Sequence, residues 1–429
     1  MTTNPFQSQS LNDWLFYLEQ QHPTEIELGL ERINQVAERA KVKDLGAKKT
    51  VLVAGTNGKG TTIRFIEQAL ISMGYSVGVF SSPHIHKYNE RVRINGEMLS
   101  DDAHIEAFDY IEQYKAGTSL TYFEFSTLAS YRIFQTQQLD FVLIEVGLGG
   151  RLDSTNIVEQ DISVITSIGL DHTDWLGDTK EQIAFEKAGI FKPNTTSVIG
   201  EPIRYNSIQQ QAEQHQVAQV LWAGRDYHYE VCGQVASAEP IWQYDNGVIK
   251  FESLKSNYVP TQNIATAITV LLEMGLSLEQ AQLNELIANF SLPGRMQLLS
   301  EKPIRLVDVA HNPHAVEYLV KVLRTRTPFN QCNKIIAVVA MMRDKDITQT
   351  LQLIAPYVSE WHLGALPKNQ RAASTESIKA ILEGMGEYNI TTYPDIKMAW
   401  AGAEQNQPDE TLLLGFGSFY TVADILDSQ

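Results

Sequence analysis

The chain has 429 residues, of which 43% are hydrophobic and 20% charged, and this balance is typical of a water-soluble globular protein with two domains. The net charge of −17 argues against nucleic acid as a partner, because no basic surface is available to replace the counterions of a phosphate backbone. No apolar run approaches the roughly 20 residues of a membrane span, and no signal peptide is expected. Cys232 and Cys332 lie far apart and indicate reduced thiols in a cytoplasmic protein.

Short apolar runs alternate with helical segments along the first two thirds of the chain. Such runs favour a parallel sheet that is covered on both faces, and they occupy residues 50–54, 76–80, 141–146 and 161–168. Residues 221–252 are richer in Trp, Tyr and Gly, and we expect a local antiparallel excursion there.

The alternation breaks near the LPGR segment 292–295 and then restarts. Further strands are expected at residues 305–310, 334–340 and 411–415, with helices between them. The sequence therefore predicts an α/β protein with an N-terminal domain at 1–295 and a smaller α/β domain at 296–429.

The strongest local motif is the segment AGTNGKGTT at residues 54–62, which follows a strand and opens a helix. Backbone N–H groups in such a turn, together with a helix N-terminus, form a site for phosphate. It departs from the standard Walker pattern, which has Gly where this chain has Val53 and Ser or Thr where it has Gly60. A generic glycine turn is the alternative, but a nucleotide site is favoured. The predicted ATP-binding residues of this loop are Thr56, Asn57, Gly58, Lys59, Gly60 and Thr61.

Two polar residues follow other strands of the same half. Glu145 lies at the end of the strand 141–146, and His172 follows Asp171 after the strand 161–168. Ligand crevices of parallel sheets lie at the carboxyl ends of the strands, so both side chains are candidates for a site. A salt-bridged loop carboxylate and a structural histidine are the alternatives that the residues alone leave open.

Several further motifs keep a specific order along the whole chain. They are SSPH at 81–84, EVGLGGRLD at 145–153, DH at 171–172, EKAGI at 186–190, PGR at 293–295 and DVAHNP at 308–313. Together with GTNGKGT, this series resembles the Mur ligase superfamily, and within it the folylpolyglutamate synthase family, above all its bacterial members that also have dihydrofolate synthase activity.

This resemblance implies an N-terminal P-loop ATPase domain with a mostly parallel sheet and a C-terminal Rossmann-like glutamate ligase domain. It implies an ATP-dependent ligase that converts a carboxylate to an acyl phosphate and joins it to L-glutamate. The expected substrates are dihydropteroate, which gives dihydrofolate, and reduced folates, which give polyglutamates. The family also suggests a monomer.

The resemblance further implies two Mg²⁺ sites with Ser82, Glu145, His172 and Lys187 as ligands. Mg²⁺ rarely takes nitrogen ligands, so the assignment of His172 depends mainly on the family. Lys187 is expected to carry CO₂ as N6-carboxylysine, whose carbamate oxygens suit Mg²⁺, whereas composition alone favours a lysine paired with Glu186 on a solvated helix face. Lys59, Lys187 and His172 are the expected catalytic residues.

Family members also contact ATP through residues equivalent to Asn263, Arg295 and Asp308. Ordinary hinge and cap roles are the alternatives for Arg295 and Asp308, and His311-Asn312-Pro313 is expected only to cap a helix. A nucleotide clamped by both domains would couple ATP binding to closure.

Three segments are expected to hold the pterin-bearing substrate, through aromatic faces and a carboxylate for ring nitrogens. They comprise Leu28, Gly29, Leu30, Glu31, Thr121, Tyr122, Phe123, Glu124, Leu152, Asp153 and Ser154. Without the family, the segments at 28–31 and 121–124 would be assigned to the core.

Two other functions compete with this interpretation. Peptidoglycan amino-acid ligases of the same superfamily carry a whole domain before the ATP loop, and Lys59 comes too early in this chain to leave room for it. A nucleotide-dependent switch would not need Glu145, His172 and Lys187 together, and substrate-dependent ADP release discriminates it from a ligase.

Overall fold

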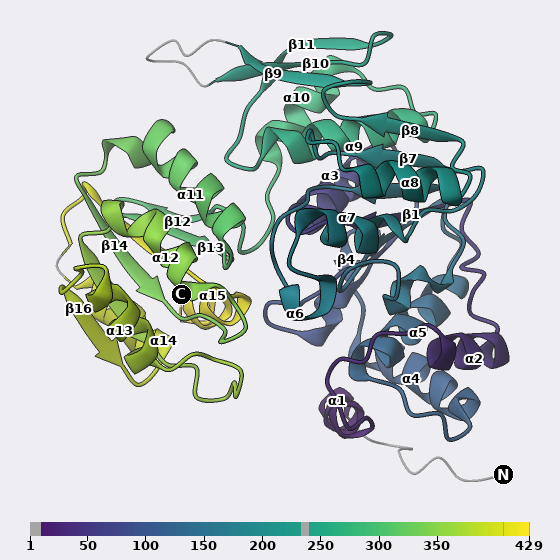
Figure 1. Cartoon of the computed structure of the whole chain (residues 1–429), viewed down its shortest axis with the longest axis horizontal. Helices are drawn as coiled ribbons and strands as arrows, with labels where there is room; N and C mark the ends of the chain where they lie inside the picture. Colours follow the sequence, from purple (N-terminus) through teal and green to yellow (C-terminus); the bar gives the residue numbers. More distant parts are fainter. Residues whose placement is uncertain (1–9, 233–239, 406, 429) are drawn as a thin grey trace. The chain divides into compact units, whose positions relative to one another are not determined.

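The chain folds into two compact units, seen in the computed structural model, which describes residues 10–232, 240–405 and 407–428 (Figure 1). The first unit contains the described residues up to Ser256 together with Thr261–Phe290, and the second contains Asn257–Pro260 and the described residues from Ser291 onward. None of the helices in these described stretches has the length and apolar character needed to cross a membrane.

An eight-stranded sheet in the order β4-β3-β2-β5-β1-β6-β7-β8 is the centre of the first unit. Six neighbouring strands, from β2 to β8, run parallel, while β3 and β4 form an antiparallel edge. The strands are β1 (Lys49–Ala54), β2 (Val77–Phe80), β3 (Val92–Ile94), β4 (Glu97–Met98), β5 (Phe141–Glu145), β6 (Ile162–Ile165), β7 (Thr196–Ile199) and β8 (Gln219–Trp222). Every residue of β5 and β6 is buried, which confirms that apolar runs of this kind are covered on both faces.

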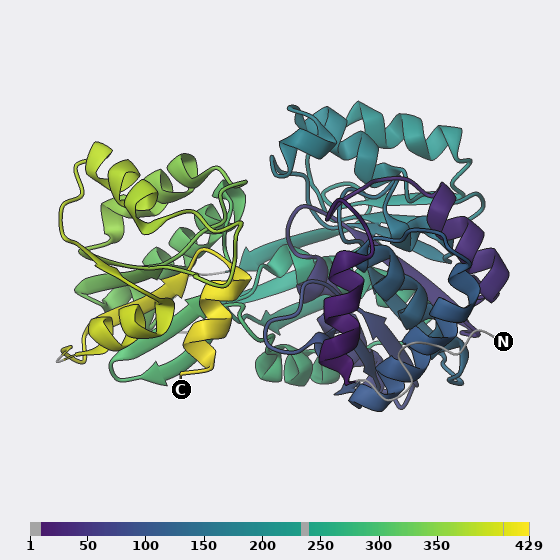
Figure 2. The ribbon, with the colours of Figure 1, turned by 90° about the horizontal axis from the view of Figure 1, so that it is seen from below.

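Helices cover this sheet. One core cluster joins side chains of α1, α2, α4, α5, α7 and α8 to the sheet residues Leu52, Phe80 and Ile144, whereas α3 and α9 pack against each other. Figures 1 and 2 both show α1, α2, α4 and α5 grouped together. The helices of this unit are α1 (Leu11–Gln20), α2 (Glu31–Ala40), α3 (Lys59–Ser72), α4 (Asp101–Lys115), α5 (Tyr122–Gln135), α6 (Thr173–Leu176), α7 (Lys180–Ala188), α8 (Asn206–Gln214), α9 (Thr261–Glu273) and α10 (Gln280–Asn289), with 3₁₀ turns η1 (Tyr88–Arg91) and η2 (Ser154–Ile157).

The expected antiparallel excursion is present but begins later than predicted. Strands β9 (His228–Cys232), β10 (Ile241–Asp245) and β11 (Lys250–Lys255) form an antiparallel sheet of their own. Leu221 and Trp222, which the prediction included in the excursion, belong instead to β8 and pair in parallel with β7. Part of the predicted segment, 233–239, lies outside the described residues.

The second unit contains a six-stranded mixed sheet in the order β12-β13-β17-β14-β15-β16. Only the pairing of β12 with β13 is antiparallel among the described pairings of this sheet. Its strands are β12 (Gln297–Glu301), β13 (Ile304–Asp308), β14 (Lys334–Val339), β15 (Glu360–Gly364), β16 (Ile390–Tyr393) and β17 (Thr411–Phe416). The strands expected near residues 305–310, 334–340 and 411–415 are confirmed as β13, β14 and β17.

Two apolar clusters cover the two faces of this second sheet. Leu412 and Leu414 contribute to one cluster and Leu413 to the other, as the alternation of side chains along a strand requires. The helices are α11 (Pro313–Thr325), α12 (Ile347–Ile354), α13 (Thr375–Gly384), α14 (Ile396–Glu404) and α15 (Phe419–Leu426), with turns η3 (Phe329–Gln331) and η4 (Ala355–Tyr357). The expected cap is confirmed, since the Asn312 side chain accepts the N–H of Ala315 and Pro313 opens α11.

Candidate active site

The phosphate loop, residues 55–59, connects β1 to α3 and requires glycine at two positions. Gly55 and Gly58 have φ values of +152° and +89°. A Cβ atom at Gly58 would lie 2.5 Å from Oδ1 of Asn263, and one at Gly55 would lie 1.9 Å from the hydroxyl oxygen of Thr166. The glycines of the motif are therefore explained by the backbone conformation and by the closeness of neighbouring elements.

Residues that follow β6 hold this loop in place. The N–H of Thr56 donates to the Ser167 carbonyl (2.9 Å), and the N–H of Asn57 donates to the Ser167 hydroxyl (3.0 Å). The Thr166 hydroxyl donates to the Asn57 carbonyl (2.7 Å). Thr56 and Asn57 thus fix the loop from the sheet side, and the N-terminus of α3 provides the N–H groups for an anion.

Lys59 and Asn263 lie at this loop as well. The Lys59 ammonium donates to the carbonyls of Gly55 (2.9 Å) and Thr56 (3.4 Å), which keeps its charge at the loop. Asn263 of α9 is buried against Gly58, and its carbonyl accepts the Thr62 hydroxyl (3.5 Å). The structure therefore brings together the predicted ATP-binding residues of the first unit, although they are some 200 positions apart in sequence.

Three neighbouring strands place polar residues at the same edge of the sheet. β5 lies between β2 and β1, and all three run parallel. Glu145 ends β5 and is buried, and its Oε2 accepts the N–H of Ser82, which follows β2 (3.2 Å). Ser82, Glu145 and the phosphate loop therefore share the carboxyl edge, where ligands of parallel sheets bind.

His172 lies after β6, on the other side of β1. It precedes α6 in a left-handed conformation (φ +52°), and its N–H donates to the Asp171 carboxylate (2.9 Å). About a third of its side chain is exposed, and its Nε2 is 4.0 Å from Oδ1 of Asp171. The histidine is thus held at the edge by its neighbour while its ring stays accessible to a ligand.

Lys187 is buried on α7, which excludes the solvated helix face that composition alone favoured. Glu186, the alternative partner, pairs instead with Arg151 (2.8 Å). Burial and the nearby positive charge of Lys59 lower the pKa of the Lys187 amino group to about 7. A large fraction of this amine is therefore neutral near pH 7.

The donor set fits a hard divalent cation only in part. Among the described residues, no three His, Cys, Asp or Glu side chains gather into a metal site. The predicted set contains two such side chains, Glu145 and His172, beside the Ser82 hydroxyl. Another anionic oxygen ligand would have to come from a modified Lys187, and a neutral amine at this position does not repel a cation.

The three segments predicted to bind the pterin lie against one another. The Gly29 N–H donates to the Leu152 carbonyl (3.3 Å), and the hydroxyls of Thr127 and Ser154 are 2.9 Å apart. Arg32 of α2 donates to the Glu124 carboxylate (3.2 Å). Segments 28–31, 121–124 and 152–154 therefore lie in one region of the first unit.

Two of the three carboxylates of this region, those of Glu124 and Asp153, bind the protein itself, whereas Glu31 is exposed. Glu124 is buried and accepts the Thr121 N–H (2.8 Å) as part of the cap of α5. Asp153 is buried and accepts the N–H groups of Leu148 (2.7 Å) and Thr155 (3.0 Å), and burial raises its pKa. A pterin nitrogen that bound Glu124 or Asp153 would have to share oxygens that already accept backbone N–H groups.

The aromatic residues of the region pack against neighbouring side chains of the first unit. Phe123 stacks on Phe80 with ring centroids 5.8 Å apart, and a Cβ atom at Gly147 would lie 2.5 Å from the Phe123 ring. The Arg91 guanidinium lies 5.4 Å from the centroid of the Tyr122 ring. Tyr122 and Phe123 are half-buried, so part of each ring can contact a ligand.

In the second unit, Arg295 and Asp308 lie close enough to interact electrostatically. Asp308 ends β13, is buried, and accepts the N–H groups of Met296 (2.7 Å) and Ala310 (2.8 Å). Burial raises the pKa of Asp308, and the Arg295 charge opposes that shift. The Arg295 guanidinium lies 5.3 Å from the centroid of the Phe419 ring.

Comparison with known proteins finds a matching family model for each of the two units. Residues 53–271 match the Mur ligase middle domain, and residues 294–419 match the Mur ligase glutamate ligase domain. A dihydrofolate synthase/folylpolyglutamate synthase of Escherichia coli is 41% identical over 99% of this chain and 96% of its own length. The protein of the same name from Bacillus subtilis is 31% identical over 87% of this chain and 88% of its own length.

The chain belongs to the Mur ligase family. Solved structures of relatives are similar to the structure of this Mur ligase over nearly its whole length. E. coli FolC in complex with DHPP and ADP has a TM-score of 0.92 at 40% identity, covering 99% of this chain and 98% of the other. A bifunctional folylpolyglutamate synthase/dihydrofolate synthase with Mn, AMPPNP and L-glutamate bound has a TM-score of 0.89 at 41% identity, covering 99% of each chain.

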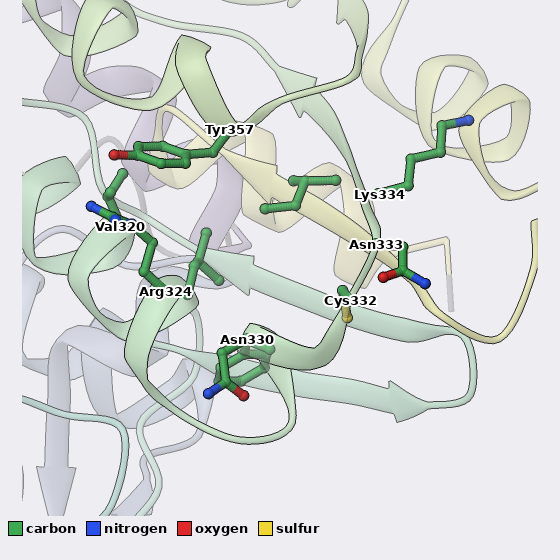
Figure 3. A pocket seen from close by; sticks show the side chains of 10 residues that line it. Val320, Arg324, Asn330, Cys332, Asn333, Lys334 and Tyr357 are labelled. Carbon is green, nitrogen blue, oxygen red and sulfur yellow. The ribbon is translucent and has the colours of Figure 1, made fainter.

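A separate cavity of about 230 Å³ lies in the second unit of the Mur ligase (Figure 3). It is lined by the start of β14 at Lys334, whereas Asp308 lies at the end of β13, so the two occupy opposite edges of the sheet. The two cationic residues that line it already contact other side chains. Arg324 lies 5.0 Å from the centroid of the Tyr357 ring, and Lys334 pairs with Glu360 (2.8 Å). Within the second unit, the cavity is therefore distinct from Asp308, one of the predicted nucleotide residues.

The sequence interpretation of this Mur ligase missed residues that hold the site without facing a ligand. Thr166 and Ser167 fix the phosphate loop, and Arg32 joins α2 to Glu124. Glu67 of α3 is completely buried between Arg64 and Arg93. The sequence signal that could have revealed the role of Glu67 is a carboxylate among the apolar residues of a helix face. Such a carboxylate is expected to be buried, and a buried carboxylate requires a charged partner.

Proposed function

We propose that this chain is an ATP-dependent ligase that joins L-glutamate to dihydropteroate, forming dihydrofolate, and to reduced folates, forming polyglutamates. The observation that carries the proposal is the shared sheet edge of the phosphate loop, Ser82 and Glu145. The names of the relatives support it, as do similar structures that contain ADP, DHPP, AMPPNP and L-glutamate.

The proposed reaction has two steps. The substrate carboxylate attacks the γ-phosphorus of ATP, which gives an acyl phosphate and ADP. The amine of L-glutamate then attacks the acyl carbon, an amide bond forms, and phosphate leaves. Lys59 and the N–H groups at the start of α3 stabilise the negative charge of the transferring phosphoryl group.

Ser82, Glu145, His172 and Lys187 are the proposed holders of Mg²⁺ at two sites. A bound divalent cation neutralises phosphate charge and helps to orient the transferring group. Lys187 would hold the second ion as N6-carboxylysine. The lowered pKa of its amine supports this modification, because only the neutral amine reacts with CO₂.

The remaining assignments of binding residues are also proposals. Asn263, Arg295 and Asp308 are proposed ATP contacts, and segments 28–31, 121–124 and 152–154 are proposed to bind the pterin-bearing substrate. For Asn263 the support is its position against Gly58. For the three segments it is the set of hydrogen bonds that joins them.

The proposal also includes a monomeric state, a cytoplasmic location and a domain boundary at Met296, although the second compact unit already resumes at Ser291. Neither Cys232 nor Cys332 forms a disulfide, which is consistent with a reducing compartment. Light scattering of the purified chain measures the oligomeric state directly.

The decisive experiment measures ADP release with dihydropteroate and with tetrahydrofolate, each in the presence and absence of L-glutamate. A ligase of this type releases ADP in a steady state only when the carboxylate substrate and glutamate are both present. A steady rate of ADP release that is the same with and without the carboxylate substrate and glutamate would instead support a nucleotide-dependent switch. Mass spectrometry of the products distinguishes dihydrofolate from extended folates.

A further inference from the structure

The segment between β2 and β3, residues 81–91, is a well-bonded turn that carries Ser82; we call it the serine turn. The N–H of Ser81 donates to the Arg91 carbonyl (2.9 Å). The Glu90 carboxylate accepts the N–H groups of Ile85 (2.7 Å), His86 (2.7 Å) and Lys87 (2.8 Å). The turn therefore keeps its own shape, and its position depends on what anchors it.

Arg93 of β3 anchors the serine turn to the helix of the phosphate loop. On one side, its guanidinium donates to the Ser81 hydroxyl (3.0 Å) and to the Glu90 carbonyl (3.1 Å). On the other side, its Nε and second terminal nitrogen donate to the two oxygens of Glu67 (3.1 and 3.0 Å). Glu67 belongs to α3, which begins at Lys59.

The geometry of this pair restricts movement. The Glu67 side chain is 0% exposed, so its charge must be compensated by a protein partner. Two parallel hydrogen bonds between a guanidinium and a carboxylate fix the relative orientation of both groups, which a lysine cannot reproduce. The serine turn and α3 are thus joined by a buried, oriented contact.

We propose that Arg93 is a positioning residue for the divalent cation: by holding Ser81 it keeps Ser82 beside Glu145 and in register with Lys59. The inference rests on the proposed assignment of Ser82 and Glu145 as metal ligands. Ser82 directly follows Ser81, and its N–H donates to Glu145 (3.2 Å), so a shift of the anchored residue displaces the ligand. Replacing a residue that orients a metal ligand commonly lowers the affinity for the metal.

The chain offers a matched control for Arg93. Arg64 also pairs with Glu67 (2.9 Å), but from within α3 itself. Replacing Arg64 weakens the neutralisation of Glu67 and leaves the hydrogen bonds to Ser81 and Glu90 in place. Replacing Arg93 also weakens the neutralisation of Glu67, and in addition it removes the hydrogen bonds to Ser81 and Glu90.

The test measures Mn²⁺ binding to the full chain with saturating AMPPNP, from the electron paramagnetic resonance signal of free Mn²⁺. Arg93→Met should weaken Mn²⁺ binding by roughly 10- to 100-fold, the range typical when a group that positions a metal ligand is removed, while Arg64→Met retains the wild-type affinity. The double variant Glu67→Met/Arg93→Met removes the buried charge with its partner, and it should fold yet still bind Mn²⁺ weakly. The affinity for AMPPNP without metal should stay unchanged in all three, because Thr166 and Ser167 hold the phosphate loop.

Each other outcome has a distinct meaning. Equal losses in Arg64→Met and Arg93→Met, or normal Mn²⁺ affinity in the double variant, would overturn the positioning role, because the effect would then come from an uncompensated Glu67. Glu145→Gln tests the underlying assignment. If it weakens Mn²⁺ binding while Arg93→Met does not, only this inference fails; if it leaves Mn²⁺ binding unchanged, the metal assignment and the inference fail together. Should Arg93→Met not fold, the double variant decides.

Discussion

Lys187 shows at the scale of one residue how burial sets chemistry. A lysine near the end of a helix is ordinarily a solvated cation, but here burial and the charge of Lys59 lower the pKa of its amine to about 7. The same burial separates it from Glu186, which binds Arg151. Lys59, in contrast, remains beside the carbonyls of its loop, so the two lysines have different environments and different proposed roles.

Lys59→Ala is expected to abolish ligation of both folate substrates and to leave the fold intact. The side chain makes its hydrogen bonds within the loop, so its loss removes little packing, whereas the loss of a charge-assisted contact to a transferring phosphoryl group costs several kcal/mol of barrier. ADP release and circular dichroism measure the two effects. Normal turnover in a folded variant would remove Lys59 from the mechanism.

Lys187→Ala is expected to lose most ligase activity and to regain part of it with millimolar acetate or formate. A short carboxylate can occupy the space of the carbamate and supply the missing anionic oxygens. Lys180→Ala, a change at an exposed position of the same helix, is the control and should need no rescue. A high-resolution map that shows an unmodified Lys187 in a fully active, metal-loaded wild-type protein would rule out the carbamate.

At the scale of elements, α5 and α4 organise the proposed pterin region. Thr121 and Glu124 close the N-terminus of α5 by a reciprocal cap, and Arg32 ties that cap to α2. Tyr122, the first residue of α5, is half-buried, and the Arg91 guanidinium lies 5.4 Å from the centroid of its ring. On α4, His104 packs against the Tyr88 ring with centroids 5.1 Å apart.

Tyr122→Ala is expected to raise the KM for dihydropteroate by about tenfold, as the loss of about 1.5 kcal/mol of aromatic contact predicts. The kcat at saturating substrate should change little, because the lost contact is one to the bound substrate and not one to the transferring phosphoryl group. Tyr114→Ala, an exposed tyrosine of α4, is the matched control. An equal rise in KM for tetrahydrofolate would show that both substrates use this ring.

His104→Phe is expected to make the first unit less sensitive to acid. Burial lowers the pKa of His104 to about 4, while the nearby Asp101 charge opposes the shift. The unfolded chain, with an ordinary histidine pKa near 6.5, therefore binds more protons between about pH 6.5 and pH 4, and folding stability falls as the pH falls through that window.

Urea midpoints at pH 7.5 and pH 5 measure this difference. The loss between the two values should be smaller for the variant than for the wild type, although His84, whose pKa is also lowered to about 4, continues to contribute. Equal losses in both proteins would show that His104 titrates normally.

At the scale of the whole molecule, the net charge of −17 opposes the binding of an anionic nucleotide. In the proposed function, Lys59 and the N-terminus of α3 overcome this field locally at the phosphate loop. A divalent cation adds positive charge at the same edge. The acidity of the chain therefore predicts a strong dependence on metal.

Removal of divalent cations with EDTA is expected to abolish ligation and to weaken ATP binding. In the absence of metal, raising KCl from about 50 mM to about 300 mM should strengthen ATP binding, because salt screens the repulsion between two anions. Fluorescence titration with a labelled ATP analogue measures this dependence. Weaker binding at high salt would instead show that the local positive charge of the loop outweighs the net charge.

The sequence by itself determined the strand–loop–helix of the nucleotide site, the polar residues at the sheet edge and the alternating strands of both units. These features depend on local signals, namely glycine positions and hydrophobic periodicity, which act over a few residues. The order of the motifs added the family. For the same reason, the prediction placed β1, β5, β13 and β17 within one or two residues of their ends.

Only the tertiary structure decided how these residues are held. It buried Lys187, assigned Trp222 to β8, turned the Glu124 carboxylate toward Thr121 and Arg32, and joined Glu67 to Arg93. Each of these outcomes depends on which distant segment covers the residue. Burial and charge pairing arise from contacts across the fold, and a local sequence pattern does not carry that information.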